Sequence, residues 1–162
     1  MHIEKIETID IQKIKSELKN LDCSGQFCFQ GLYKDQDPKE LVSHDEDFNY
    51  IWNPKYDGKV TSNNCIHPLF NLPYINYIIE QLSLGYTKLM VLKPRRCYAY
   101  HTDKSPRIHI PIITNKNNFF IVEDKIYRLP ANGAVYKVDT TKMHSFVNAS
   151  KETRLHIVGI QR

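Results

Sequence analysis

The sequence predicts a mainly β protein with some helix, in which short strands form a sandwich or barrel and two helices pack outside it. From residue 87 to the end of the chain, apolar residues alternate with polar ones in eight short segments, and turn-forming residues separate these segments. Before residue 85, two stretches instead carry apolar residues at three- and four-residue steps, which is the period of a helix. Seven or eight short strands in one half of a chain are typical of sandwiches and barrels.

Each predicted helix has a start signal. Asp10 is a good N-cap residue, and an apolar stripe follows it. The second helix is predicted to start near Asn71 with Pro73 in its first turn, where a missing N–H costs nothing, and to end at Gly85. The apolar stripe of the first helix consists of Ile11, Ile14, Leu18 and Leu21. The buried face of the second helix is expected to consist of Tyr74, Ile75, Ile78, Ile79 and Leu82.

The strand candidates fill the C-terminal half, whereas residues 22–70 are irregular. That irregular region contains three prolines and the acidic, aromatic run "SHDEDFNYIW", so we interpret it as loops and short strands that cover something. The strand candidates are residues 87–94, 97–101, 107–113, 118–123, 125–130, 134–138, 145–149 and 154–160.

Composition and charge narrow the class of protein. The 162 residues are 41% hydrophobic and 25% charged, as in soluble globular proteins, and no apolar run is long enough to span a bilayer. The first residues lack the apolar core of a signal peptide, and the four scattered cysteines suit reduced thiols better than a zinc site, so a cytoplasmic location is expected. The net charge of +4 is interspersed, and we interpret "KPRR" at 93–96 as a solvated strand end, which argues against a nucleic-acid partner.

Two histidines and an aspartate in the β half suggest a metal site. His101 and Asp103 point to the same side of a strand, because residues i and i+2 of a strand share a face. His144 follows in a β context, and Arg154 opens the last strand ten residues later. Two imidazoles and one carboxylate form the ligand triad of non-haem Fe(II) oxygenases, and an arginine is suited to clamp a carboxylate through two parallel hydrogen bonds. His-X-Asp alone is also common as a surface or packing pair.

At these residues the chain resembles the aspartyl/asparaginyl β-hydroxylase branch of the Fe(II)/2-oxoglutarate-dependent oxygenases. The matching segments cover residues 86–162, about half of the chain. They are "HTD" at 101–103, "RIHIP" at 107–111, "VDTTKMHSFVN" at 138–148 and "RLHIV" at 154–158.

The resemblance implies a fold and a chemistry. The expected fold is a double-stranded β-helix, the jelly-roll or cupin-like barrel. One oxygenase domain would span residues 1–162, with 1–85 as helical and irregular support and a candidate substrate cover, and 86–162 as the catalytic barrel. The implied reaction consumes 2-oxoglutarate and O₂, releases succinate and CO₂, and hydroxylates an amino-acid residue in a peptide or protein, or a free amino acid.

The resemblance also implies a role for each matching residue. His101, Asp103 and His144 would bind Fe(II), and Arg154 would pair with the C5 carboxylate of 2-oxoglutarate. His109 would contact the C1 end of the co-substrate, and Arg107 would hold co-substrate or prime substrate nearby. The presence of the aspartate argues against a halogenase, which needs that coordination position for a halide.

Strand alternation agrees with these roles. In "RIHIPII", Arg107 and His109 share one face while the isoleucines share the other, which is predicted to pack on the outer helices. In the last strand, Arg154 and His156 share a face, so His156 either lies with the functional residues or is satisfied by a neighbouring strand.

Other residues carry weaker signals. Tyr98 and Tyr100 are core aromatics or substrate contacts, Asn148 is expected to tie a loop near His144, and Asp139 is expected to orient its turn. His44 and His67 are interpreted as ordinary polar positions, whereas the aromatic group Phe48, Tyr50 and Trp52 forms either a substrate lid or a small satellite core.

Two rival functions stay open from the sequence. The same scaffold could oxidise another small metabolite or a nucleobase, or it could be a non-catalytic β-barrel module that retains a metal. The expected partner is a peptide, protein or small-molecule substrate, without a membrane. The prime substrate and the oligomeric state are not defined by the sequence.

Overall fold

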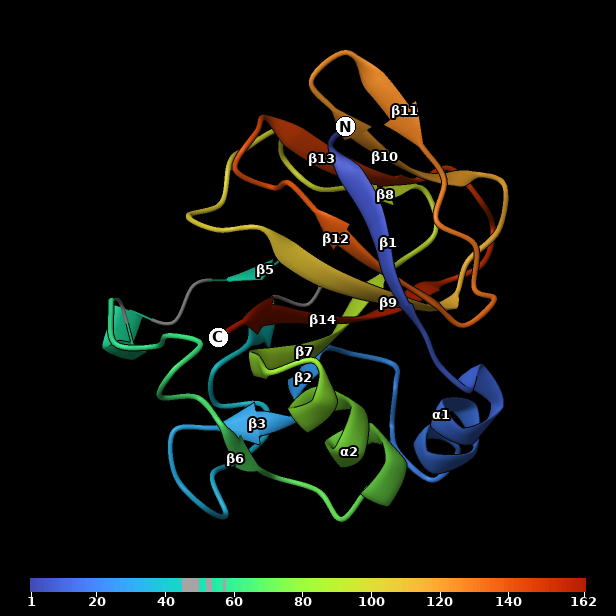
Figure 1. The fold of residues 1–162 in the computed structure, drawn as a ribbon. Coiled ribbons are helices and arrows are strands. Elements are labelled where there is room, and N and C mark those ends of the chain that lie inside the picture. Colours follow the sequence, from blue (N-terminus) through green and yellow to red (C-terminus); the bar gives the residue numbers. More distant parts are fainter. Residues whose placement is uncertain (45–49, 52–53, 57) are drawn as a thin grey trace.

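The computed structural model describes residues 1–44, 50–51, 54–56 and 58–162 and consists mainly of antiparallel β-structure (Figure 1). Its largest sheet has the order β1-β12-β9-β14-β7-β2. The bounds of these strands are Ile3–Thr8 for β1, Ala134–Val138 for β12, Arg107–Ile113 for β9, Arg154–Gln161 for β14, Leu84–Leu92 for β7 and Phe27–Cys28 for β2. The first and last belong to the N-terminal half of the chain, so both halves build this sheet.

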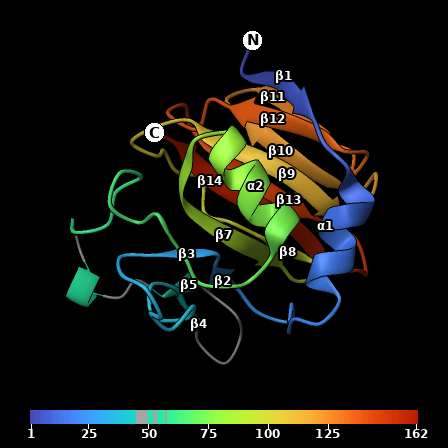
Figure 2. The ribbon, with the colours of Figure 1, turned by 60° about the horizontal axis from the view of Figure 1, so that its bottom comes forward.

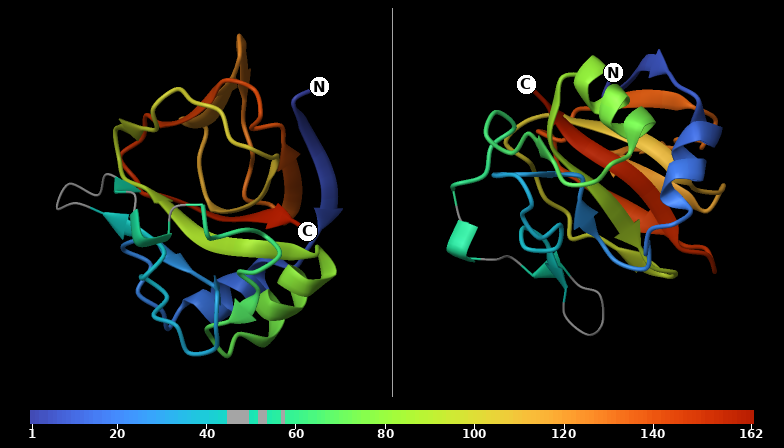
Figure 3. Two further views of the ribbon diagram at one scale, coloured as in Figure 1. Left: turned by 90° about the vertical axis from the view of Figure 1, so that its left-hand side faces the viewer. Right: turned by 90° about the horizontal axis from the view of Figure 1, so that it is seen from below.

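A second, four-stranded sheet faces the first and has the order β11-β10-β13-β8 (Figures 1 and 3). Its strands are Lys125–Tyr127 for β11, Asn118–Val122 for β10, His144–Asn148 for β13 and Arg96–Cys97 for β8. Two small sheets pair β3 (Gln30–Gly31) with β6 (His67–Pro68) and β4 (Ser43–His44) with β5 (Tyr50–Ile51). A short 3-10 helix covers Pro54–Tyr56.

Two helices, α1 (Ile11–Leu18) and α2 (Pro73–Gln81), cover the outer face of the six-stranded sheet (Figure 2). Asp10 caps α1, because its Oδ1 accepts hydrogen bonds from the backbone N–H groups of Gln12 and Lys13 at 3.0 and 3.2 Å. Pro73 begins α2 as the sequence predicts. The start signals of both helices are therefore confirmed.

The six-stranded sheet separates two apolar cores. The outer core joins Ile14 of α1 and Ile75 of α2 to the sheet, and it includes all three alternating isoleucines of β9. The inner core lies between the two large sheets and contains Phe120 and Phe146 from the four-stranded sheet. The isoleucine face predicted to pack on the helices does so, which directs Arg107 and His109 toward the opposite face.

Gly85 does not end α2, contrary to the sequence prediction. It lies inside β7, where a Cβ atom would sit 1.8 Å from the carbonyl oxygen of Ser62. The residue with left-handed backbone after the helix is Ser83, with φ of 51°. Gly85 is thus required for close passage of another segment rather than for a helix cap.

The mainly β character with two helices is confirmed, whereas the predicted double-stranded β-helix is not confirmed, because the described strands do not close into a barrel. Within the described ranges the two large sheets are separate antiparallel sheets that share no strand. The predicted strand at 97–101 is only partly regular: β8 ends at Cys97, and His101 then forms an isolated bridge with His144. The segment from Cys97 to His101 therefore pairs with β13 only at some positions and does not form a complete strand ladder.

Of the aromatic group predicted to form a lid or a satellite core, Phe48 and Trp52 fall outside the described residues. All four cysteines are free thiols. No helix in the described part of the chain is long and apolar enough to cross a membrane.

Candidate active site

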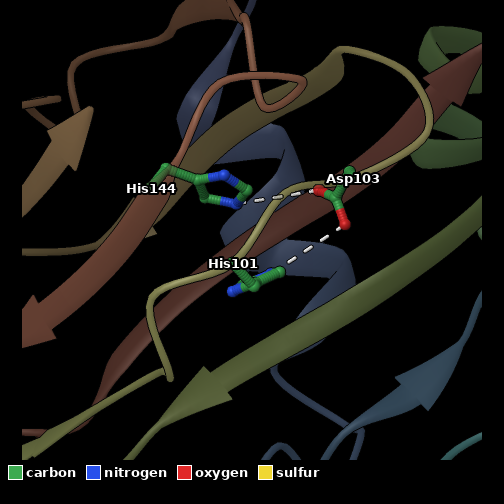
Figure 4. Close-up of side chains that lie close together, drawn as sticks. All are labelled: His101, Asp103 and His144. Carbon is green, nitrogen blue, oxygen red and sulfur yellow. Dashed lines mark ion pairs between the residues drawn. The ribbon is translucent and has the colours of Figure 1, made fainter. Parts of the chain in front are cut away.

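His101, Asp103 and His144 form one cluster at an edge of the space between the two large sheets (Figure 4). One potential ligand atom from each residue lies within 4.8 Å of the others. The Asp103 carboxylate is 3.9 Å from Nε2 of His101 and 3.7 Å from Nε2 of His144. The three side chains point toward one another, so the arrangement fits a single metal ion.

The backbone fixes the spacing of the cluster. His101 and His144 exchange two backbone hydrogen bonds, with N···O distances of 3.0 and 2.9 Å, although they are 43 positions apart. The N–H of Asp103 donates to the carbonyl of Thr140 at 2.8 Å. Because both contacts tie the 101–103 segment to the chain around β13, the cluster does not rest on side-chain packing alone.

Both imidazoles are oriented for metal binding. Nδ1 of His101 lies 2.6 Å from the carbonyl oxygen of Ala99, and Nδ1 of His144 lies 2.9 Å from that of Lys142. A carbonyl accepts only from a protonated nitrogen, so Nδ1 carries the proton, and in the neutral imidazole Nε2 presents its lone pair toward the cluster. Burial also lowers the pKa of His144, which favours the neutral form that a metal requires.

The exposure of the three ligand candidates is graded. The His101 side chain is 44% exposed, that of Asp103 is 21% exposed, and that of His144 is 6% exposed. Arg107 of β9 donates from Nε to Asp103 at 3.2 Å and so holds the carboxylate in place. The cluster thus has a buried side, at His144, and a side reachable from solvent, at His101.

Arg154 lies between the sheets and is almost fully buried, at 1% exposed. Its Cζ is 3.8 Å from the ring centroid of Phe146, yet its Nε and NH1 atoms have no hydrogen-bond partner among the described residues. Burial lowers its pKa to about 10, and the neighbouring Tyr98 opposes this shift, so the guanidinium stays charged near neutral pH. A buried charge with free donors fits an anionic ligand such as a carboxylate.

His109 and His156 form a buried pair next to Arg154. Their Nδ1 atoms are 3.3 Å apart, and burial holds the pKa of each imidazole well below 6.5. If Nδ1 of His156 donates, Nε2 of His109 carries the proton and is a donor toward an anion. Nε2 of His156 is buried without a hydrogen-bond partner among the described residues, so this histidine is both paired with a neighbouring strand and located among the functional residues.

The remaining candidates have structural contacts. Asn148 is buried and its amide binds the carbonyls of Leu92 and Glu152, so it ties the loop after β13 as expected. Asp139 accepts from Thr141 and orients its turn, as expected.

The two tyrosines on either side of Ala99 differ in burial. Tyr98 packs against the inner core, whereas Tyr100 is 46% exposed and donates to the carbonyl of Glu123. His67 is exposed in β6, as expected for an ordinary polar position.

Sequence reasoning missed Lys88. This lysine lies on β7 within the strand predicted for residues 87–94, and its side chain is on the same sheet face as His109. The sequence does indicate which residues share its face, since strand alternation places Lys88 on one face of the strand and Leu89 and Val91 on the other. Only the strand order shows that its face is the inner one.

A β-rich fold with a histidine–aspartate–histidine cluster beside a buried arginine defines a candidate mononuclear metal enzyme. The sequence profile described as aspartyl/asparaginyl beta-hydroxylase matches residues 10–159. The chain therefore belongs to the aspartyl/asparaginyl β-hydroxylase family, a family of hydroxylases. The match extends through the N-terminal half, which the sequence resemblance at residues 86–162 did not reach.

Other comparisons add little. Comparison with curated proteins gives no match. Among solved structures, the plu4264 protein from Photorhabdus luminescens aligns with a TM-score of 0.40 and 13% identity, covering 47% of this chain and 61% of that one. The aligned part is thus about three fifths of that protein's length, and this likeness carries no further argument.

Proposed function

We propose that the protein is an Fe(II)/2-oxoglutarate-dependent hydroxylase acting on an amino-acid residue in a peptide or protein, or on a free amino acid. The observation that carries the proposal is the cluster of His101, Asp103 and His144, with ligand atoms within 4.8 Å and both Nε2 atoms directed inward. Two imidazoles and one carboxylate leave coordination positions for co-substrate and O₂. Membership in a hydroxylase family supports the reaction type.

The residues around the cluster suit this chemistry. When bound, iron and 2-oxoglutarate supply the oxidation that converts a substrate C–H, O₂ and 2-oxoglutarate into C–OH, succinate and CO₂. Arg154 would bind the distal carboxylate of 2-oxoglutarate with its free Nε and NH1 donors, and burial would keep water from competing. Nε2–H of His109 would donate to the C1 carboxylate end.

Arg107 has a different role in this proposal. It would hold Asp103 in position through the 3.2 Å contact and remain near the substrate. We also propose that the two facing antiparallel sheets correspond to the two halves of the double-stranded β-helix. A cytoplasmic location stays a prediction.

The proposal is tested with His144→Ala. We expect wild-type protein to bind Mn(II), observed by electron paramagnetic resonance, and to form succinate from 2-oxoglutarate with Fe(II) and ascorbate. His144→Ala removes the most buried ligand candidate, so both signals should be lost.

The control is His67→Ala, which removes an exposed histidine outside the cluster and should keep both signals. Normal Mn(II) binding and normal succinate formation by His144→Ala would contradict the proposal. Metal binding without succinate formation by wild-type protein would instead favour a metal-retaining binding module. If wild-type protein does form succinate, mass spectrometry of cell lysate for products heavier by one oxygen atom identifies the substrate.

A further inference from the structure

Lys88 projects from β7 onto the inner face of the six-stranded sheet. Its Cα is paired with that of Val158 on β14, and Val158 is paired with His109 on β9. Residues paired in this way across adjacent strands lie on one face, so Lys88 and His109 face the same interior. Lys88 is partly buried, whereas its sequence neighbours Thr87 and Leu89 are fully buried on the other face.

Lys88 and Arg154 serve opposite ends of this interior. Arg154 and Val158 are four residues apart on β14, which corresponds to about 13 Å along the strand. Lys88 is beside Val158, at the end where Arg107 reaches Asp103. A co-substrate held by Arg154 would therefore leave Lys88 to another molecule.

The Lys88 ammonium is a cation without a paired anion in the described part of the chain. Its Nζ lies 4.1 Å from the ring centroid of Tyr86, which positions the ammonium. Burial lowers the pKa of Lys88, and Arg107 acts in the same direction, while Asp103 opposes them. No carboxylate among the described residues forms an ion pair with Lys88, since Asp103 is already held by Arg107 at 3.2 Å.

The two thiols near Lys88 do not supply this anion. Cys28 is its direct cross-strand neighbour, and Cys65 belongs to the same apolar cluster as Cys28. Burial raises the pKa of each thiol to about 12, so both are neutral near neutral pH. Among the described residues, one positive charge is therefore uncompensated on this side of the metal cluster, and a single carboxylate would balance it.

We propose that Lys88 binds a carboxylate of the prime substrate and selects acidic substrates over their neutral amides. This inference rests on the proposed hydroxylase function and names the substrate class of the same site. The ring of Tyr86 holds the ammonium, and the carboxylate would make a charge-assisted hydrogen bond with it.

The test compares two probes that differ only in charge, N-acetyl-aspartate methylamide and N-acetyl-asparagine methylamide. Binding to the full chain is measured by calorimetric titration, both without additions and in the presence of Mn(II) and 2-oxoglutarate. We expect the aspartate probe to bind roughly 10-fold more tightly, because a charge-assisted bond is about twice as strong as a neutral one. Lys88→Met should bring the ratio of the two affinities close to one, and Lys88→Arg should restore most of it.

Lys5→Met is the matched control, because Lys5 belongs to the same cross-strand row but is exposed on β1. It should keep the ratio of wild type. Equal binding of both probes, no binding of the aspartate probe up to about 10 mM, or a ratio unchanged in Lys88→Met would overturn the proposal. So would a Lys88→Met variant that loses affinity for 2-oxoglutarate instead of the probe.

Failure of this proposal is distinguishable from failure of the hydroxylase proposal. If the aspartate preference depends on Lys88 but the protein neither binds Mn(II) nor forms succinate, the carboxylate site stands and the hydroxylase is wrong. If Mn(II) binding and succinate formation depend on His144 but the probe ratio is independent of Lys88, only the carboxylate site is wrong.

Discussion

The buried cationic and imidazole side chains are costly for the folded state. Arg154 places a charge between two sheets without filling its hydrogen-bonding capacity, and His109 and His156 lie next to it in neutral form. A buried donor without a partner costs about 1–3 kcal/mol, more for a charged group. Such groups are typical of sites where a ligand completes the hydrogen bonding.

The buried histidine pair predicts how stability depends on pH. The pKa values of His109 and His156 are held below 6.5 in the folded protein, so protons bind preferentially to the unfolded chain as the pH falls below 6.5. Their contribution to stability is therefore complete above pH 6.5 and declines below it. The two together should give a slope of about 2.7 kcal/mol per pH unit, and His144 acts in the same direction.

Urea unfolding of the metal-free protein between about pH 5 and pH 8 measures this slope. His156→Gln should reduce it by about 1.4 kcal/mol per pH unit, one proton's share. The exposed His67 provides the control, and His67→Gln should keep the wild-type slope. The same slope in His156→Gln as in wild type would show that His156 is not buried in neutral form.

At the scale of elements, Gly85 joins β7 to the segment before α2. A Cβ at this position would lie 1.8 Å from a backbone oxygen of Ser62, and the neighbouring N–H of Tyr86 donates to the carbonyl of Cys65 at 2.8 Å. Gly85→Ala should destabilise the protein by about 3 kcal/mol, since a backbone segment must move. The free energy of unfolding in urea measures this loss.

Gly25 is the matched control for this prediction. No atom lies within 4 Å of the position of its Cβ, and its φ is not in the left-handed region. Gly25→Ala should leave stability unchanged or raise it by about 0.5 kcal/mol through a less flexible unfolded chain. Equal stability of both variants would contradict the close packing of Ser62 on β7.

The elements that the sequence predicts well are those specified by local patterns. The cap at Asp10, the proline at the start of α2 and the alternating isoleucines of β9 each depend on a few neighbouring residues. Gly85 was misassigned because its reason is a contact with Ser62, which no local pattern reveals. The strand β1 was missed because it is mostly exposed and contains a register shift after Lys5.

The candidate site shows the same division. His101 and Asp103 were recognisable together from their His-X-Asp spacing, although Asp103 lies outside any strand of the structure. His144 and Arg154 were recognisable from their places in the β half, and the family resemblance added the roles of these residues. The two backbone hydrogen bonds between His101 and His144 and the inner position of Lys88 follow from strand order. Long-range pairing of this kind is set by the whole hydrophobic core and cannot be obtained from alternation alone.

At the scale of the whole molecule, the candidate site connects the two large sheets. His144 begins β13 in the four-stranded sheet, while Arg154 and His109 belong to the six-stranded sheet. A metal bound at His144 and a dicarboxylate extending from that metal to Arg154 would therefore stabilise the packing of the sheets as well as the site. Ligands that bind only the folded state should raise its stability by an amount set by their concentration and affinity.

This coupling predicts two separable increments of stability. Mn(II) at about 100 times its dissociation constant should add about 2.7 kcal/mol to the free energy of unfolding, and 2-oxoglutarate at a similar excess should add a comparable amount. Arg154→Met should keep the metal increment but lose most of the 2-oxoglutarate increment, because the distal carboxylate loses its cation. His144→Ala should lose both, since 2-oxoglutarate binds partly through the metal.

Without ligands, Arg154→Met should be as stable as wild type or more stable by about 1 kcal/mol, because it removes a buried charge with unfilled donors. Urea unfolding with and without each ligand provides all of these values. An Arg154→Met protein that retains the full 2-oxoglutarate increment would exclude this arginine as the carboxylate partner. An unliganded Arg154→Met protein less stable by about 3 kcal/mol or more would show that the guanidinium mainly supports the packing of the two sheets.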